Sequence, residues 1–231
     1  MKKDAERPGR SDPPATPTRR RVLLVDDHPI MRAGLKQLIE TQSDLCVAAE
    51  ASDVAEALMR VERVDVDIVL TDLTLPGRGG LELIKDIHAL RPEMAIVVLS
   101  MHDEALYAER AIRAGARGYL MKEAGGERVL DAVRQVLDGR IYLSPAMTTS
   151  LLSGLGGHSA AQSRSPFARL TDREMEVFQL VGNGKSTREI ARLLNLSTKT
   201  VDVHRGHIRA KLELDDNTAL IRHAVRWIET Q

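Results

Sequence analysis

Acidic, hydroxyl and basic side chains follow four short aliphatic runs in the first half of the chain, namely Asp26 with Asp27, then Asp72, Ser100 and Lys122. Three carboxylates held close together repel one another, and burial raises their pKa values unless a cation joins them. Mg²⁺ is a hard ion that prefers oxygen ligands and accepts phosphate as a further partner. These residue types therefore predict a Mg²⁺-dependent phosphoryl site. Asp72 would be the nucleophile, Lys122 the cationic partner of the phosphoryl group, and the Ser100 hydroxyl a hydrogen-bond donor to it.

The aliphatic runs themselves predict the elements that would position these side chains. They span residues 22–25, 66–70, 95–99 and 118–120, and uninterrupted apolar runs of this length are typical of strands buried on both faces. Stretches with helical spacing separate them. Alternating strands and helices predict an α/β fold with a doubly wound, five-stranded parallel sheet. Ligands bind such sheets at the carboxyl ends of the strands, where all four polar signals fall.

Each polar signal also has a structural interpretation. Asp26 and Asp27 precede Pro29, so they could cap a helix that begins there. Asp72 could be a turn residue, and Lys122 a solvated charge. The placement of all of them at strand ends favours a single functional pocket over separate structural roles.

Residues 20–143 resemble the receiver domain of bacterial two-component response regulators. The segment Asp72-Leu-Thr-Leu-Pro-Gly77 resembles the loop written D-L-x-M-P-G, with Leu75 in place of methionine, a swap that nearly conserves volume. The resemblance implies that Asp72 is the phosphoacceptor and that Lys122 binds the phosphoryl group. It also implies that Asp26, Asp27, Asp72 and the backbone carbonyl of Thr74 hold Mg²⁺, and that Ser100 and Tyr119 are switch residues.

The second half of the chain has helix signals and no strand-like runs. Thr171 followed by Glu174 is a capping box, and the glycines at 182 and 184 end the helix that it opens. Thr187 is expected to cap a second helix, and Ser197 or Thr198 a third. Two short helices joined by a tight turn predict a helix-turn-helix.

Residues 168–231 resemble the LuxR-type DNA-binding domain of response regulators of the NarL/FixJ class. The resemblance rests on Leu170-Thr-Asp-Arg-Glu174, Ile190-Ala191 and Lys199-Thr-Val-Asp-Val-His-Arg205. It implies that a fourth helix from about Asn217 is a dimerisation element. It also implies that the unphosphorylated receiver covers the recognition helix.

Residues on two adjacent faces of the third helix are the candidate DNA contacts: Thr198, Lys199, Thr200, Asp202, Val203, Arg205, Gly206 and Arg209. Arginine can neutralise phosphate or bind guanine, and Val203 could contact a thymine methyl group. Asp202 could accept a hydrogen bond from cytosine or pair with Arg205 three residues on. His204 and His207 are interpreted as packing or backbone contacts rather than a metal site.

Charge and composition divide the chain into four parts. Residues 1–19 are expected to form a disordered basic tail, 20–143 the receiver, 144–167 a flexible linker that can hold a short helix, and 168–231 the DNA-binding domain. The 33 basic and 33 acidic residues are unevenly distributed, with a net charge of −6 over 21–143 and +2 over 168–231. No apolar run is long enough for a secretory signal or a membrane span, and the single cysteine fits a reducing cytoplasm.

The sequence thus predicts a transcriptional regulator whose Asp72 is phosphorylated by a histidine kinase and whose C-terminal domain binds promoter DNA as a homodimer. No enzymatic activity is expected beyond self-phosphorylation and slow self-dephosphorylation. Two alternatives remain. One is a constitutive DNA-binding protein with a vestigial receiver. The other is a Mg²⁺-dependent phosphotransfer enzyme, although the chain lacks the D-x-D nucleophile loop that such hydrolases usually need.

Overall fold

The computed structural model describes residues 19–101, 104–149 and 166–229. Most of the expected tail and of the expected linker lies outside these residues. The part of the linker that is described begins with a helical turn at 145–149, where the hydroxyl of Ser144 accepts a hydrogen bond of 3.1 Å from the backbone N–H of Met147. This turn is where the sequence predicts a short helix to start.

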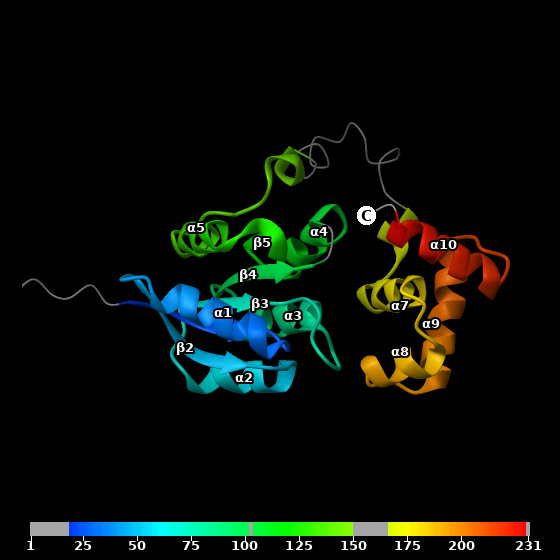
Figure 1. Ribbon diagram of the computed structural model, residues 1–231, viewed down its shortest axis with the longest axis horizontal. Helices are drawn as coiled ribbons and strands as arrows, with labels where there is room; N and C mark the ends of the chain where they lie inside the picture. The colour runs from blue at the N-terminus through cyan, green and yellow to red at the C-terminus, as the bar shows by residue number, and fades with distance from the viewer. Residues whose placement is uncertain (1–18, 102–103, 150–165, 230–231) are drawn as a thin grey trace, which may run out of the picture.

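The N-terminal unit alternates strands and helices along the chain (Figure 1). Its strands form one parallel sheet in the order β2-β1-β3-β4-β5, which confirms the predicted fold class. The elements are β1 (Arg20–Val25), α1 (Pro29–Glu40), β2 (Leu45–Ala51), α2 (Val54–Arg63), β3 (Ile68–Thr71), α3 (Gly80–Leu90), β4 (Ala95–Ser100), α4 (Glu104–Ala114), β5 (Gly118–Met121), the 3₁₀ turn η1 (Lys122–Ala124) and α5 (Gly126–Leu137).

Helices cover both faces of this sheet. The side chains of Val69 and Ile96 point to the face covered by α2, α3 and α4. Those of Leu70 and Val97 point to the opposite face, which is covered by α1 and α5. Because successive strand residues alternate between two buried faces, the strands appear in the sequence as continuous apolar runs.

Strand β3 begins two residues later than the apolar run suggests. The run starts at Val66, but the strand starts at Ile68 because Asp67 has another role. Its carboxylate accepts hydrogen bonds from the backbone N–H of Arg21, at 2.7 Å, and from the guanidinium of the same residue, at 3.1 and 3.2 Å. Asp67 therefore fixes the start of β3 against β1.

The C-terminal unit is helical. It contains η2 (Pro166–Arg169), α7 (Asp172–Gly182), α8 (Thr187–Leu193), α9 (Thr198–Lys211) and α10 (Asn217–Glu229). The Thr171–Glu174 capping box forms as predicted, and Ser197 caps α9. The cap of α8 is Ser186 rather than Thr187, because Ser186 forms its own capping box with Glu189.

The core of this unit lies between α7, α9 and α10. Phe178 and Val177 of α7, Ile208 of α9 and Leu220 of α10 are fully buried. Trp227, the only tryptophan of the chain, packs on Phe178 with ring centroids 5.7 Å apart. Its fluorescence is therefore a specific reporter of this unit.

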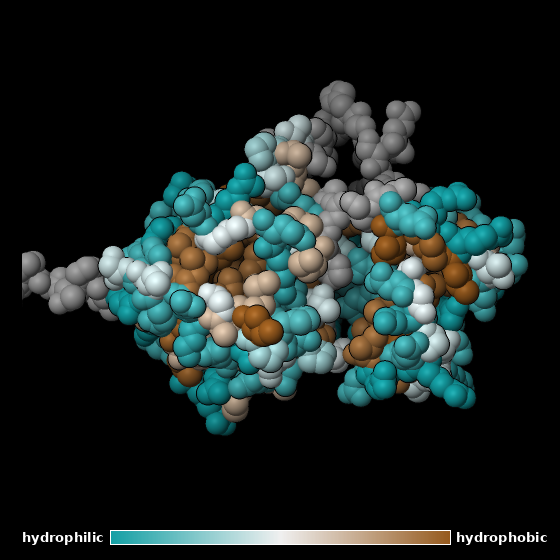
Figure 2. Space-filling model, in the orientation of Figure 1, coloured by the Kyte–Doolittle hydropathy of each residue, from teal (hydrophilic) through white to brown (hydrophobic). Residues whose placement is uncertain are grey.

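The surface shown in Figure 2 is largely hydrophilic over both units, with smaller apolar areas between the charged side chains. In the part of the chain that the structure describes, no helix is both long and apolar enough to cross a membrane.

Candidate functional site

The parallel sheet brings the predicted phosphoryl-site residues to one edge. Asp26 and Asp27 directly follow β1, Asp72 follows β3, Ser100 ends β4, and Lys122 follows β5. Because β1, β3, β4 and β5 are consecutive neighbours in a parallel sheet, their carboxyl ends lie side by side. The polar signals noted in the sequence are therefore neighbours in space.

Lys122 joins two of the carboxylates. Its Nζ lies 2.8 Å from Oδ2 of Asp26 and 2.8 Å from Oδ2 of Asp72. The side chains of Asp26 and Asp72 are each 3 % exposed, and that of Lys122 is 6 % exposed. Buried charges are retained when they are paired and hydrogen-bonded, and here one ammonium serves both carboxylates.

Backbone groups hold both acidic side chains in place. The N–H of His28 donates to Oδ1 of Asp26 at 2.8 Å, and the N–H of Thr74 donates to Oδ1 of Asp72 at 3.1 Å. The N-cap position of α1 is His28, and no side chain caps that helix. Asp26 and Asp27 therefore do not act as helix caps, and the structural alternative for this pair is wrong.

The pKa values reflect competition between burial and pairing. Burial raises the pKa of Asp72, and the hydrogen bond from Lys122 opposes this shift only in part. Burial disfavours the Lys122 ammonium, yet its hydrogen bonds to Asp26 and Asp72 outweigh that effect and raise its pKa. Burial thus favours the neutral form of Asp72, whereas its pairing with Lys122 favours the ionised form.

The donor set suits a hard cation. Ligand atoms of Asp26, Asp27, His28 and Asp72 all lie within 4.8 Å of one another, and three of these side chains offer carboxylate oxygens. Asp27 is the most accessible of the three carboxylates, with a side chain that is 33 % exposed. Carboxylate oxygens on an open side of a pocket are the kind of ligand that Mg²⁺ accepts, because this ion usually keeps several waters.

Ser100 and Tyr119 occupy neighbouring strands near this edge. Both are fully buried, at 0 % and 1 % exposure, and Ser100 pairs in register with Met121, two residues after Tyr119. The backbone N–H of Tyr119 donates to the carbonyl of Tyr142 at 3.0 Å. A buried hydroxyl thus ends β4, and a buried aromatic ring lies on β5, the strand that leads to Lys122.

One residue that supports the pocket was not predicted from the sequence. Arg32 of α1 donates from Nη1 to the carbonyl of Asp26 at 2.6 Å and from Nε to Glu50 of β2 at 3.3 Å. It lies one helical turn after His28, so helical periodicity alone would have placed it beside the acidic loop. An isolated arginine on an amphipathic helix, however, resembles any solvated charge.

Most predicted DNA contacts lie on the accessible side of α9. Thr198, Lys199, Asp202 and Val203 are exposed, and Thr200, Gly206 and Arg209 are partly buried. Arg205 is also partly buried. Its Nη1 donates a hydrogen bond of 2.8 Å to the hydroxyl of Thr187 at the start of α8. Arg205 thus joins the two helices of the helix-turn-helix.

Asp202 and Arg205 lie three residues apart on α9. Among the described residues no ion pair joins Asp202 to Arg205, whose guanidinium contacts Thr187 instead. Asp202 is exposed on α9, and its contact with a base stays a prediction. His204 is partly buried, and this burial lowers its pKa. His207 lies 3.6 Å from the buried carboxylate of Glu174, a contact that the sequence did not reveal.

The recognition helix is not covered by the receiver in this structure. The N-terminal unit faces α7 and α8, and α9 lies on their far side (Figure 1). The ion pairs between the units come from Asp172 at the start of α7. The expectation that the receiver masks the recognition helix is therefore wrong for this conformation, because a different helix makes the contact.

Both halves of the chain match known families. A model of the response regulator receiver domain matches residues 22–134, and a model of bacterial regulatory proteins of the luxR family matches residues 168–224. The fold and the acidic edge of the sheet agree with the first match, and the helix-turn-helix agrees with the second. The chain belongs to the response regulators that combine a receiver with a LuxR-type DNA-binding domain, and it is a transcription regulator of this class.

Named relatives extend over nearly the whole chain. The oxygen regulatory protein NreC of Staphylococcus carnosus is 35 % identical over 210 residues, which cover 89 % of this chain and 97 % of NreC. NreC of Staphylococcus aureus strain JH9 matches equally well. A structure of the Salmonella typhimurium response regulator RcsB is 26 % identical with a TM-score of 0.67, covering 90 % of this chain and 98 % of that one. RcsB bound to a promoter is 25 % identical with a TM-score of 0.63, at the same coverage.

Proposed function

We propose that Asp72 accepts a phosphoryl group from a histidine kinase and that this modification controls promoter binding by the C-terminal domain. The observation that carries the proposal is the buried Lys122 ammonium, which lies 2.8 Å from both Asp26 and Asp72. A cation held at the reacting carboxylate can stabilise the charge of a transferring phosphoryl group without reorganisation.

Each pocket residue has a proposed part in this reaction. An Asp72 oxygen attacks phosphorus, the N–P bond of the donor phosphohistidine breaks, and its electron pair returns to the imidazole, which takes up a proton. Lys122 binds the phosphoryl oxygens. Asp26, Asp27, Asp72 and the Thr74 carbonyl would hold Mg²⁺, which when bound neutralises charge on the phosphoryl group.

The effect of phosphorylation would reach the DNA-binding domain through buried side chains of the receiver. The Ser100 hydroxyl would donate a hydrogen bond to the phosphoryl group. Tyr119 on the neighbouring strand would change its packing in response. The C-terminal domain would then bind a promoter as a homodimer, with α10 as the dimerisation element. The contacts would come from Thr198, Lys199, Thr200, Asp202, Val203, Arg205, Gly206 and Arg209.

The two alternatives make different predictions at Asp72. A vestigial receiver would form no acyl phosphate, and a phosphotransfer enzyme would turn over a small phosphate ester many times. A cytoplasmic location remains a prediction from the sequence.

The test is to incubate the full chain with acetyl phosphate and Mg²⁺ and to measure the intact mass. We expect the wild type to gain one phosphoryl group that hydroxylamine removes, as an acyl phosphate requires. Asp72→Asn should gain none. Asp65→Asn is the matched control, because Asp65 precedes β3 and its side chain is 78 % exposed. A phosphoryl group retained by Asp72→Asn would refute the assignment.

A further inference from the structure

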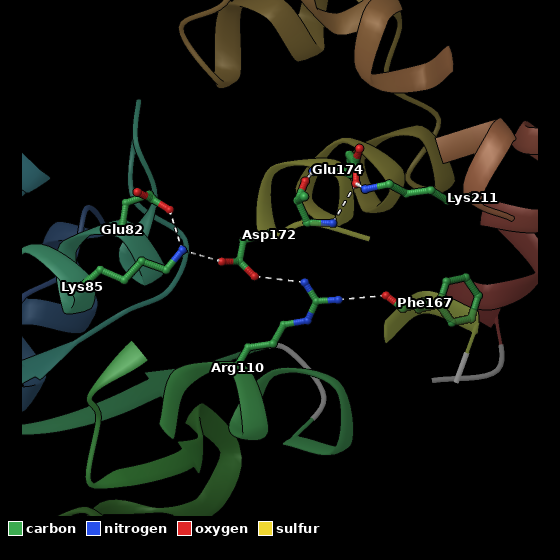
Figure 3. Close-up of polar contacts among 8 residues, drawn as sticks. Glu82, Lys85, Arg110, Phe167, Asp172, Glu174 and Lys211 are labelled. Carbon is green, nitrogen blue, oxygen red and sulfur yellow. Dashed lines mark hydrogen bonds and ion pairs between the residues drawn. The ribbon is translucent and has the colours of Figure 1, made fainter. Parts of the chain in front are cut away.

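The DNA-binding domain contacts the receiver through α7, as Figure 3 shows. Asp172, the first residue of α7, accepts from Nζ of Lys85 on α3 at 3.0 Å and from Nη1 of Arg110 on α4 at 3.0 Å. Arg110 also donates from Nη2 to the carbonyl of Phe167 at 2.8 Å. These contacts hold the start of α7 against two receiver helices.

A second residue of α7 reaches further into the receiver. The carboxylate of Glu176 lies against Gly79, the residue that precedes α3. A Cβ atom at Gly79 would be only 2.5 Å from Oε1 of Glu176, and Gly79 has a φ of +75°. The side chain of Glu176 is 22 % exposed, and Arg173 pairs with it at 2.7 Å. A side chain at position 79 would require the Glu176 carboxylate to move, and the positive φ independently favours glycine there.

Gly79 belongs to the loop that begins at Asp72. The neighbouring Gly80 lies directly against the Asp72 carbonyl, so closely that a side chain there would collide with the backbone. The N–H of Gly80 donates to the carbonyl of Leu73 at 2.8 Å. The loop from 72 to 80 therefore closes on itself, and its far end touches both Asp72 and Glu176.

We propose that Glu176 is a positioning residue that restrains the phosphoacceptor loop from the DNA-binding domain and thereby slows phosphoryl transfer to Asp72. This inference rests on the proposed function of Asp72. The contact between the domains would then act on the phosphoacceptor loop and would not cover the recognition helix, because α9 is accessible while α7 is docked.

The direction of the effect follows from the loop geometry. In this structure the N–H of Thr74 donates to Oδ1 of Asp72, so one carboxylate oxygen is already engaged by the loop. Use of Oδ1 in the attack would displace the Thr74 N–H, and Gly80, which packs on the Asp72 carbonyl, would carry that movement to Gly79. A carboxylate seated on Gly79 resists the movement. Because coupling between sites is reciprocal, phosphorylation should in turn weaken the docking of α7.

The test compares phosphorylation rates of full-length variants with acetyl phosphate and Mg²⁺. Glu176→Ala removes the contact, and we expect it to react at least about fivefold faster than the wild type, the lower end of typical coupling between sites. Glu176→Gln keeps the shape of the side chain and should react at the wild-type rate. Glu213→Ala is the matched control, because Glu213 follows α9 and its side chain is 81 % exposed.

Hydrogen exchange of the backbone amides from 73 to 80, measured without phosphodonor, reads the restraint directly. Glu176→Ala should exchange faster there, while Trp227 fluorescence stays unchanged. A Glu176→Ala rate less than about fivefold above that of the wild type, or unchanged exchange in the loop, would overturn the inference and leave Asp72 as phosphoacceptor. If the wild type accepts no phosphoryl group at all, the proposed function fails, and the role of Glu176 in phosphoryl transfer fails with it.

Discussion

Lys122 is the residue on which the charge balance of the pocket depends. It is the cation that both buried carboxylates share, and burial already raises the pKa of Asp72 despite its presence. Removing one partner of a buried ion pair leaves an uncompensated charge, which costs far more than an exposed ion pair contributes. The same arrangement that suits phosphoryl binding therefore makes the receiver depend on one lysine.

We predict that Lys122→Ala lowers the free energy of unfolding of the receiver by about 3–5 kcal/mol in the absence of divalent ions. Adding Asp72→Asn to this variant should recover part of the loss, because it removes one of the two unpaired charges. Urea unfolding followed by circular dichroism measures both effects. Equal stability of Lys122→Ala and the wild type would mean that the ammonium does not neutralise the pocket.

Glu174 is a buried carboxylate paired with a lysine in the DNA-binding domain, as Asp72 is in the receiver. It is 3 % exposed, and its Oε2 accepts from Nζ of Lys211 at 2.6 Å and from the N–H of Thr171 at 2.7 Å (Figure 3). Burial raises the pKa of Glu174, but the hydrogen bonds from Lys211 and Thr171 outweigh it and lower the pKa below the usual 4.5. Ionised Glu174 therefore stabilises the fold.

The stabilisation by Glu174 should depend on pH. A carboxyl whose pKa is lower in the folded state contributes fully above its unfolded pKa of 4.5, and the contribution is lost as the pH falls through the folded value. We expect the urea midpoint reported by Trp227 to fall more steeply between about pH 5 and about pH 3 in the wild type than in Glu174→Gln. Glutamine keeps the capping box and removes only the charge. Parallel pH profiles would contradict this account of Glu174.

At the level of the helices, the room around the glycine differs between Gly182 and Gly206. Gly182 ends α7 where α10 crosses it, and a Cβ there would lie 2.7 Å from the carbonyl oxygen of Ala224 and from Cγ1 of Ile228. Gly206 is inside α9, and a Cβ there would meet nothing within 4 Å. The first glycine is required by packing, whereas the second only weakens its helix.

Alanine substitutions at these glycines should therefore change stability in opposite directions. We predict that Gly182→Ala destabilises the DNA-binding domain by about 1–3 kcal/mol through overpacking against α10. Gly206→Ala should stabilise it by up to about 1 kcal/mol, since alanine is the better helix former. Urea unfolding followed by Trp227 fluorescence measures both. The opposite order of stabilities would refute the packing of α7 on α10.

The elements also show what the sequence can and cannot predict. Strands buried on both faces, and helices with capping boxes, leave local signals, so the sheet and the helix-turn-helix were predicted correctly. The proximity of Asp26, Asp72, Ser100 and Lys122 could be predicted because the carboxyl ends of parallel strands lie at one edge of the sheet. Contacts such as Arg32 with Asp26 or Arg205 with Thr187 could not be predicted, because a charged residue with a distant partner has the same local sequence signal as a solvated one.

At the scale of the whole molecule, the two domains meet through charge. The receiver segment is acidic overall, yet it presents Lys85 and Arg110 to Asp172 of the DNA-binding domain. These side chains are partly exposed, so their interaction is weak and sensitive to salt. Weak contacts suit a regulator, because a modification must be able to shift the balance between docked and open arrangements.

We predict that Arg110→Glu opens the molecule, since it replaces two hydrogen-bonding contacts with repulsion from Asp172. The radius of gyration measured by small-angle X-ray scattering should rise relative to the wild type. Arg128→Glu is the matched control, because Arg128 is exposed on α5, whereas the ion pairs with Asp172 come from α3 and α4. If both variants scatter like the wild type, the docking through Asp172 does not hold the domains together in solution.

We propose that phosphorylation of Asp72 in the receiver controls DNA binding by α9 in the other domain. Because α9 is accessible in the docked form, unphosphorylated protein should already bind DNA weakly, and binding should weaken as salt screens its phosphate contacts. Phosphorylation should then strengthen binding by releasing α7 and favouring the dimer on two half-sites.

The most direct test is to measure the affinity for promoter DNA over a range of salt concentrations, with and without acetyl phosphate and Mg²⁺, for the wild type and for Asp72→Asn. If Asp72 controls DNA binding by α9, phosphodonor tightens binding by the wild type and leaves binding by Asp72→Asn unchanged. Equal affinity of both proteins under all conditions would contradict it, and would favour a constitutive DNA-binding protein whose receiver does not act as a switch.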